Sequence, residues 1–156
     1  MPQLRLALAQ VDPVVGDLAG NADRIVSWSA HAAERGAHVV AFPEMMLTGY
    51  PAEDLVLRPS FVEASATALE TLAKRLAVEG LGELAVVVGF VDRPPARGLT
   101  PSGPPRALPY DAAAFLHRGR IVARYTKHHL PNYGVFDEFR YFSQGGRLAV
   151  VRHLGV

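Results

Sequence analysis

A chain of 156 residues, 49% of them apolar, can bury one compact core but not two. The 16 basic and 15 acidic residues leave a net charge of +1, with neither the basic stripe of a nucleic-acid-binding surface nor the acidic block of a disordered tail. With no cysteine, the chain itself cannot supply a disulfide, a thiolate metal site or a cysteine nucleophile. No segment has the pattern of a signal peptide or a membrane span, so we expect a cytoplasmic protein.

The first part of the chain alternates strand and helix patterns. Leucines 4, 6 and 8 alternate with other residues and predict a first strand. Asn21 is the predicted N-cap of a helix that ends at Gly36, with Ile25, Trp28 and Ala32 at helical spacing. Residues 38–42 are apolar on both faces, as in a central parallel strand. This order predicts a βαβ unit.

A second helix and three further strands follow. A capping box formed by Ser60 and Glu63 predicts the start of the helix, and its buried stripe comprises Val62, Leu69, Leu72 and Leu76. Residues 84–91 predict another buried strand, and the Pro- and Gly-rich residues 92–109 predict a flexible loop. We expect residues 110–116 and 120–127 to form a hairpin, residues 128–146 to be irregular and residues 148–151 to begin a strand. The fold class is α/β.

Glu44 is the first candidate for chemistry. It follows Pro43, just beyond the predicted strand 38–42, and ligands bind at the carboxyl edge of open α/β sheets. Its neighbours Phe42, Met45 and Met46 are apolar, so we expect burial to raise its pKa toward the range of a general base. The alternative is a helix cap or a salt-bridged loop residue.

Lys127 is the second candidate. It is one of only two lysines among the 16 basic residues, which indicates a position that needs a compact ammonium group. It ends a strand in which Ile121, Ala123 and Tyr125 are expected to share its face, so its side chain is expected to point inward. A buried ammonium needs a carboxylate partner or a developing negative charge. The alternative is an edge-strand lysine that prevents aggregation.

Other motifs provide weaker evidence for a functional site. His128 and His129 are adjacent, and on an extended segment their side chains point in opposite directions, so we expect no metal site. The chain contains neither a nucleophile-elbow serine nor a phosphate-binding glycine loop.

Taken together, the segments around Glu44 and Lys127 resemble the carbon–nitrogen hydrolase (nitrilase) superfamily along essentially the whole chain. The runs TGYPAEDL (Thr48–Leu55) and KHHLPNYGVFDEFRYF (Lys127–Phe142) are similar to the glutaminase domains of glutamine-dependent NAD⁺ synthetases. The resemblance implies an α-β-β-α sandwich, of which residues 1–156 form about the first half. It also implies a Glu–Lys–Cys triad, in which Glu44 and Lys127 match the first two members.

The same resemblance implies roles for further residues. Tyr50, Tyr133 and Phe136 are candidate substrate-pocket residues, and Glu138 matches a supporting glutamate that orients Lys127 and the substrate amide. L-Glutamine would be the substrate, and a synthetase domain would receive the ammonia and amidate nicotinic acid adenine dinucleotide to NAD⁺. ATP and Mg²⁺ would belong to that domain, so we expect no cofactor on residues 1–156, and we expect a homo-oligomer in the full-length protein.

The resemblance leaves out the nucleophile and the synthetase domain, neither of which lies within residues 1–156. We therefore expect the isolated chain to be inactive. Two alternatives remain open: a truncated stand-alone amidase of the same superfamily, and a non-catalytic remnant that binds a partner. The coding sequence downstream of Val156 would discriminate between them.

Overall fold

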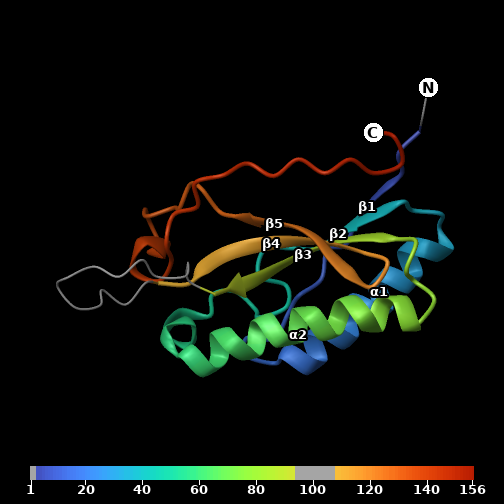
Figure 1. Ribbon diagram of the computed structural model, residues 1–156. Coiled ribbons are helices and arrows are strands. Elements are labelled where there is room, and N and C mark those ends of the chain that lie inside the picture. The colour runs from blue at the N-terminus through green and yellow to red at the C-terminus, as the bar shows by residue number, and fades with distance from the viewer. Residues whose placement is uncertain (1–2, 94–107) are drawn as a thin grey trace.

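The computed structural model describes residues 3–93 and 108–156. They form a mixed five-stranded sheet in the order β1-β2-β3-β4-β5 (Figure 1). Three parallel strands are followed by an antiparallel hairpin: β1 (Leu6–Leu8), β2 (Val39–Ala41), β3 (Ala85–Asp92), β4 (Tyr110–His117) and β5 (Arg120–Thr126). The predicted α/β class and the hairpin are confirmed. No helix in the described ranges is long and apolar enough to cross a membrane.

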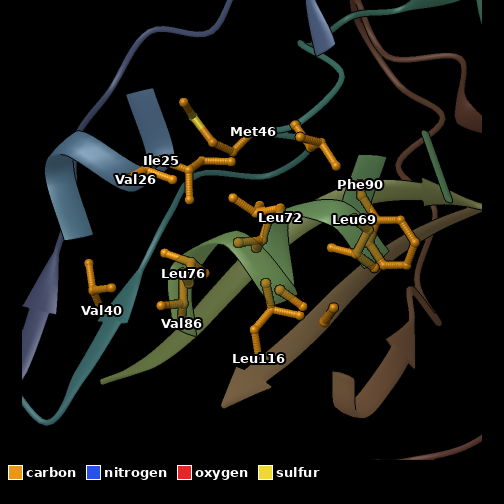
Figure 2. Close-up of a cluster of buried hydrophobic side chains, with 14 of the residues drawn as sticks. Ile25, Val26, Val40, Met46, Leu69, Leu72, Leu76, Val86, Phe90 and Leu116 are labelled. Carbon is orange, nitrogen blue, oxygen red and sulfur yellow. The ribbon is translucent and has the colours of Figure 1, made fainter. Parts of the chain in front are cut away.

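Helix α1 (Leu18–Glu34) connects β1 to β2, and helix α2 (Pro59–Val78) leads into β3. Both helices cover the same face of the sheet (Figure 1). The core between the helices and the sheet contains three residues of the stripe predicted for α2, together with residues from α1, the strands and the turn after β2 (Figure 2): Ile25, Val40, Met46, Leu69, Leu72, Leu76, Val86, Phe90 and Leu116. The fourth residue of the stripe, Val62, is buried in a second apolar cluster. This burial of apolar surface is the main force that holds the helices against the sheet. Trp28 of the predicted α1 stripe is the exception, because it remains exposed.

Both predicted helix caps are wrong. Helix α1 begins three residues before Asn21, and Asp17 caps it by accepting a hydrogen bond from the Gly20 N–H. Asn21 is instead buried and bonds to the backbone of Val14 and Leu47, so it fixes two loops. These tertiary bonds outweigh its local preference for a cap.

At α2 the N-cap position is Arg58, which makes no side-chain capping bond, and Pro59 occupies the first turn. Proline suits that position because its missing N–H would have no partner there. Glu63, predicted to close a capping box, pairs with Arg93 at 2.6 Å instead.

The chain after η2 (Glu138–Arg140) passes back over the face of the hairpin that the helices leave free (Figure 1). Gly145 donates to the Lys127 carbonyl at 2.8 Å, and the His153 ring packs on Phe115 and His117 of β4. The predicted strand at 148–151 is wrong: its residues are in no strand, and Leu148 and Val150 are exposed. The run of apolar residues predicts extended backbone, but a strand also needs a neighbour to pair with. Most of the predicted loop 92–109 lies outside the described residues.

Candidate active site

Glu44 is positioned by a tight turn that crosses from the end of β2 over the middle of β3. Just after β2, the Phe42 N–H donates a hydrogen bond to the Val87 carbonyl of β3. Beyond the turn, the Leu47 N–H donates to the Gly89 carbonyl at 3.0 Å. A side chain at Gly89 would collide with the backbone of residues 43–45. Glycine is therefore required for the turn to lie directly on β3, and this contact carries Glu44 toward the hairpin.

Lys127 directly follows β5 and is held through its backbone. Its N–H donates to the Asp111 carbonyl at 2.8 Å, and its own carbonyl accepts from Gly145 at 2.8 Å. A register shift at Phe115/Leu116 interrupts the alternation of β5, so Ile121 lies opposite Leu116 of the core while Tyr125 lies opposite Ala113. The prediction of one shared face was therefore wrong for Ile121, because a bulge resets which face a side chain occupies.

Three carboxylates surround the Lys127 ammonium. Its Nζ lies 2.5 Å from Glu44 Oε1, 2.8 Å from Glu138 Oε2 and 3.3 Å from Asp111 Oδ2. The side chains of Glu138 and Asp111 are only 4% exposed, whereas Lys127 is 23% and Glu44 48% exposed. The alternative reading of Lys127 as a solvated edge lysine is excluded by these contacts.

Asp111 was missed by the sequence analysis. It is the second residue of β4, where the start of this antiparallel strand lies beside the end of β5. The available signal was a lone carboxylate in a run of alanines, since aspartate is depleted in strands. Motif reasoning passed over it because no recognisable pattern surrounds it.

The structure brings four of the remaining predicted positions into one chain of contacts. The Tyr50 hydroxyl donates to Glu138 Oε1 at 3.2 Å, and its ring lies 6.5 Å from that of Phe136. Phe136 in turn contacts the Tyr133 ring at 5.6 Å. Glu138 thus links the aromatic group to Lys127. Tyr133 is the outermost member and is largely exposed.

The charges of the cluster shift one another's pKa values. Burial lowers the pKa of Lys127, but hydrogen bonds to Glu138 and Glu44 and the nearby carboxylates raise it by more, so the ammonium is stable at neutral pH. Burial together with the charge and hydrogen bond of Glu138 raises the pKa of Tyr50 to about 12. The phenol therefore remains a hydrogen-bond donor to Glu138.

The expected rise in the pKa of Glu44 is wrong. Partial burial does raise it, but hydrogen bonds with Asp111 and Lys127 and the positive charge of Lys127 lower the pKa overall. The sequence showed the apolar neighbours of Glu44. It did not show that the Lys127 ammonium, from the end of β5 at the edge of the sheet, contacts the Glu44 carboxylate. Glu44 is an anion at neutral pH.

A cleft of about 270 Å³ lies beside the cluster. Glu44, Asp111 and Lys127 form its polar part, and the apolar lining comes from Phe42, Val87, Gly89, Ala112, Ala113 and Tyr125. A cleft with apolar walls and a few converging polar groups suits a small substrate with one polar reacting end.

Two groups bear on metal binding. One oxygen from each of Glu44, Asp111 and Glu138 lies within 4.8 Å of the others, a spacing that could hold a cation, and the Lys127 ammonium lies among them. His128 and His129 do not point apart as expected, since their rings are 4.6 Å from each other. His128 Nδ1 lies 2.6 Å from the Gly145 carbonyl, which is the contact of a structural histidine.

The mixed sheet, with an anionic glutamate and an ammonium group at the edge of a cleft, defines an α/β protein with a candidate acid–base site. The family model of carbon-nitrogen hydrolases matches residues 5–155. The chain therefore belongs to the carbon–nitrogen hydrolase family.

Relatives and solved structures agree with this assignment. The chain is 40% identical to a glutamine-dependent NAD⁺ synthetase of Thermotoga maritima, with 97% of the chain and 24% of the relative aligned. A structure of the Acinetobacter baumannii glutamine-dependent NAD⁺ synthetase superposes with a TM-score of 0.78 at 34% identity, covering 99% of this chain and 26% of that one. The chain thus spans about a quarter of the length of these relatives.

An amidase from Nesterenkonia sp., in a structure that shows acrylamide added at its active-site cysteine, superposes with a TM-score of 0.70 at 25% identity. That match covers 98% of this chain and 54% of the amidase. The nitrilase-like fold expected from the sequence is confirmed, and the chain covers its first part.

Proposed function

We propose that this chain is the front part of the glutamine-hydrolysing domain of a glutamine-dependent NAD⁺ synthetase. The observation that carries the proposal is the placement of Lys127, 2.5 Å from Glu44 and 2.8 Å from Glu138 beside the cleft. The identity of 40% to the Thermotoga maritima synthetase supports glutamine as the nitrogen donor. The aligned quarter of that relative is the part we assign to this role.

The proposed reaction needs a base, an oxyanion site and a nucleophile. Glu44 is anionic and takes the proton of a cysteine thiol, which then attacks the side-chain amide carbon of glutamine. Lys127 stabilises the negative oxygen of the tetrahedral intermediate. The C–N bond breaks, the proton held by Glu44 passes to the leaving ammonia, and a thioester remains. Water activated by Glu44 then releases glutamate and the free thiol.

The low ground-state pKa keeps Glu44 ionised, so it is free to accept a proton when the substrate arrives. When the substrate oxygen takes over part of the Lys127 hydrogen bonding, Glu44 loses some of the interaction that lowers its pKa. Its affinity for a proton then increases at the step where the thiol must give one up. Glu138, which keeps its contact with Lys127 and Tyr50, holds the ammonium in place meanwhile.

Tyr50, Phe136 and Tyr133 are the proposed wall for the substrate. Tyr50 and Phe136 are joined to the catalytic group through Glu138, whereas Tyr133 reaches the surface. Neither Tyr50 nor Phe136 lines the cleft beside Glu44 and Lys127, so we assign them to an adjoining wall next to Glu138 and Tyr133 to the entrance.

The remaining parts of the machinery would come from outside residues 1–156. The chain contains no cysteine, so the nucleophile belongs to a downstream segment. The synthetase domain, which would bind ATP and Mg²⁺ and use the ammonia, likewise lies outside. Assembly of the full-length protein as a homo-oligomer is part of the same proposal.

The similarity to the Nesterenkonia amidase supports a second candidate, a stand-alone amidase that shares this fold and acts on another amide. Both candidates use Glu44 and Lys127 in the same way. An ATP-binding domain encoded downstream of Val156 would favour the synthetase, and a reading frame that ends after the cysteine-bearing segment would favour the amidase.

The test is ammonia release from glutamine by the longer protein encoded from this region. We expect turnover in the wild type and a loss of at least 100-fold in Glu44→Gln, because general-base catalysis contributes about 10²–10⁴-fold. The isolated chain should release no ammonia. Lys74→Ala, which changes the only other lysine, on an exposed part of α2, is the matched control and should retain full activity. Wild-type activity in Glu44→Gln would contradict the proposal.

A further inference from the structure

The side chain of Asp111 is the least satisfied of the groups around Lys127. It is 4% exposed, and its Oδ2 lies 3.3 Å from Lys127 Nζ. This oxygen is buried and forms no hydrogen bond within the described residues. The same holds for Glu138 Oε2, but Glu138 accepts hydrogen bonds from Tyr50 and Lys127 at its Oε1, whereas no such bond reaches the Asp111 carboxyl group in the described part of the chain. A buried carboxylate oxygen without a hydrogen bond destabilises the fold. Either a proton on the carboxyl group or a nearby hydrogen-bond donor would remove this cost.

The charge count of the cluster points to a proton. One oxygen of Glu44, Asp111 and Glu138 each lies within 4.8 Å of the other two, and Lys127 is the one cation that contacts them in the described part of the chain. With every group ionised, three negative charges would face one positive charge. Carboxylates this close disfavour one another's ionised forms, so one of them retains a proton.

The contacts decide which carboxyl group holds that proton. Glu44 receives the shortest bond from Lys127 and is the most exposed of the three, while Glu138 accepts from both Lys127 and Tyr50. Asp111 is as buried as Glu138 but has the longest contact with the ammonium. Ionisation is therefore least supported at Asp111.

We propose that Asp111 is a positioning residue of the site, a neutral carboxylic acid at pH 7 whose Oδ2–H donates a hydrogen bond to the Glu44 carboxylate. In this form it adds no third negative charge, and it holds Glu44 anionic and close to Lys127. The protonation of Asp111 stands on the geometry of the cluster alone. Its value for catalysis rests on the proposed glutaminase function.

The pKa values agree with this assignment. Burial, followed by the hydrogen bond and the charge of Glu44, raises the pKa of Asp111 to about 8, against the opposing effect of Lys127. Glu138 adds to the rise, and Tyr50 reaches the group only through Glu138. The pKa of Asp111 in the folded protein exceeds its ordinary value of 3.8. The contribution of Asp111 to folding stability is therefore complete below about pH 3.8 and is lost as the pH rises through about 8.

The direct test is a carbon-13 NMR titration of the 156-residue chain with labelled aspartate and glutamate carboxyl carbons. We expect the Asp111 signal, assigned through its bonded neighbours, to titrate near pH 8. Asp92→Asn is the matched control, since Asp92 is a buried aspartate on β3 that has Arg124 as a partner at 3.4 Å. That variant should leave the titration of Asp111 in place. Titration of wild-type Asp111 below pH 5 would overturn the proposal.

Two variants test the positioning role. Asp111→Asn keeps a donor of similar shape and should leave the Glu44 titration at low pH, whereas Asp111→Leu removes the donor and should move it upward. Equal Glu44 titrations in the two variants would overturn the positioning role, and if either variant fails to fold, the wild-type Asp111 titration still decides the protonation.

In the longer protein, we expect the wild-type kcat/KM for glutamine to fall as Asp111 loses its proton above about pH 8, and we expect Asp111→Asn, which keeps a donor that does not titrate, to lack this fall. These NMR outcomes do not require glutamine hydrolysis, so their failure is distinguishable from failure of the proposed function.

Discussion

The two ends of the β4–β5 hairpin both carry ionic contacts, but of opposite character. At the turn, Arg118 and Glu83 form a paired contact with bonds of 2.7 and 2.9 Å, and their side chains are 67% and 78% exposed. At the open end, Lys127 meets three carboxylates, two of which are 4% exposed. At the turn, one positive and one negative group therefore pair in solvent. At the open end, one positive group faces three carboxyl groups, two of which are buried.

This difference shows how an ion pair with only a structural role can be distinguished from a cluster of charged residues at a functional site. A solvated one-to-one pair needs no special surroundings and contributes little to stability. Crowding Glu44, Asp111 and Glu138 around one ammonium costs desolvation energy and repulsion, which an apolar packing arrangement would avoid. Such clusters with shifted pKa values are concentrated at functional sites.

The largest effect is expected from removing the cation at the open end. Lys127→Ala leaves the buried Glu138 carboxylate without its positive partner, and we expect the free energy of unfolding to fall by about 3–5 kcal/mol. Urea denaturation of the chain at pH 7 measures this fall. Lys74→Ala, at an exposed position of α2, is the control for losing a lysine. Equal stabilities of the two variants would mean that the buried cluster is no more important than a surface charge.

A smaller effect is expected at the glycine that lets Glu44 reach the open end. The added methyl group of Gly89→Ala would meet the backbone of residues 43–45, which cannot move as a flexible side chain can. We expect a loss of about 1–3 kcal/mol from overpacking, with a change in the Glu44 carboxyl NMR shift. Gly146→Ala, where the new methyl group would meet nothing within 4 Å, serves as control. An unchanged Glu44 signal in Gly89→Ala would argue against the proposed positioning of the turn.

The smallest effect is expected at the turn of the hairpin. Arg118→Ala removes one partner of an exposed pair, and the remaining Glu83 is fully solvated, so thermal denaturation should show almost no change. Raising the salt concentration should reduce any difference further. A destabilisation as large as that of Lys127→Ala would remove the contrast between the two ends.

The errors in the sequence analysis show where local patterns lose to tertiary contacts. Asn21 has the chemistry of a helix cap, yet it bonds to Val14 and Leu47, which the fold brings to it from both sides in sequence. The apolar run at 148–151 is typical of a strand, but pairing depends on a neighbouring strand, which the run itself does not contain. Asp111 escaped notice because its importance comes entirely from the charges that surround it.

Residue patterns close along the chain were enough to predict the α/β alternation, the hairpin, the buried stripe of α2, and Glu44 and Lys127 as residues at strand ends. These features depend on neighbours within one turn or one strand, where backbone geometry sets the period. The meeting of Glu44 and Lys127 depends on more, because β3 and β4 separate the strands that precede them. The turn packed on Gly89, the register of β4 with β5 and the return of Glu138 bring the charges together, and the resulting burial and field set their pKa values.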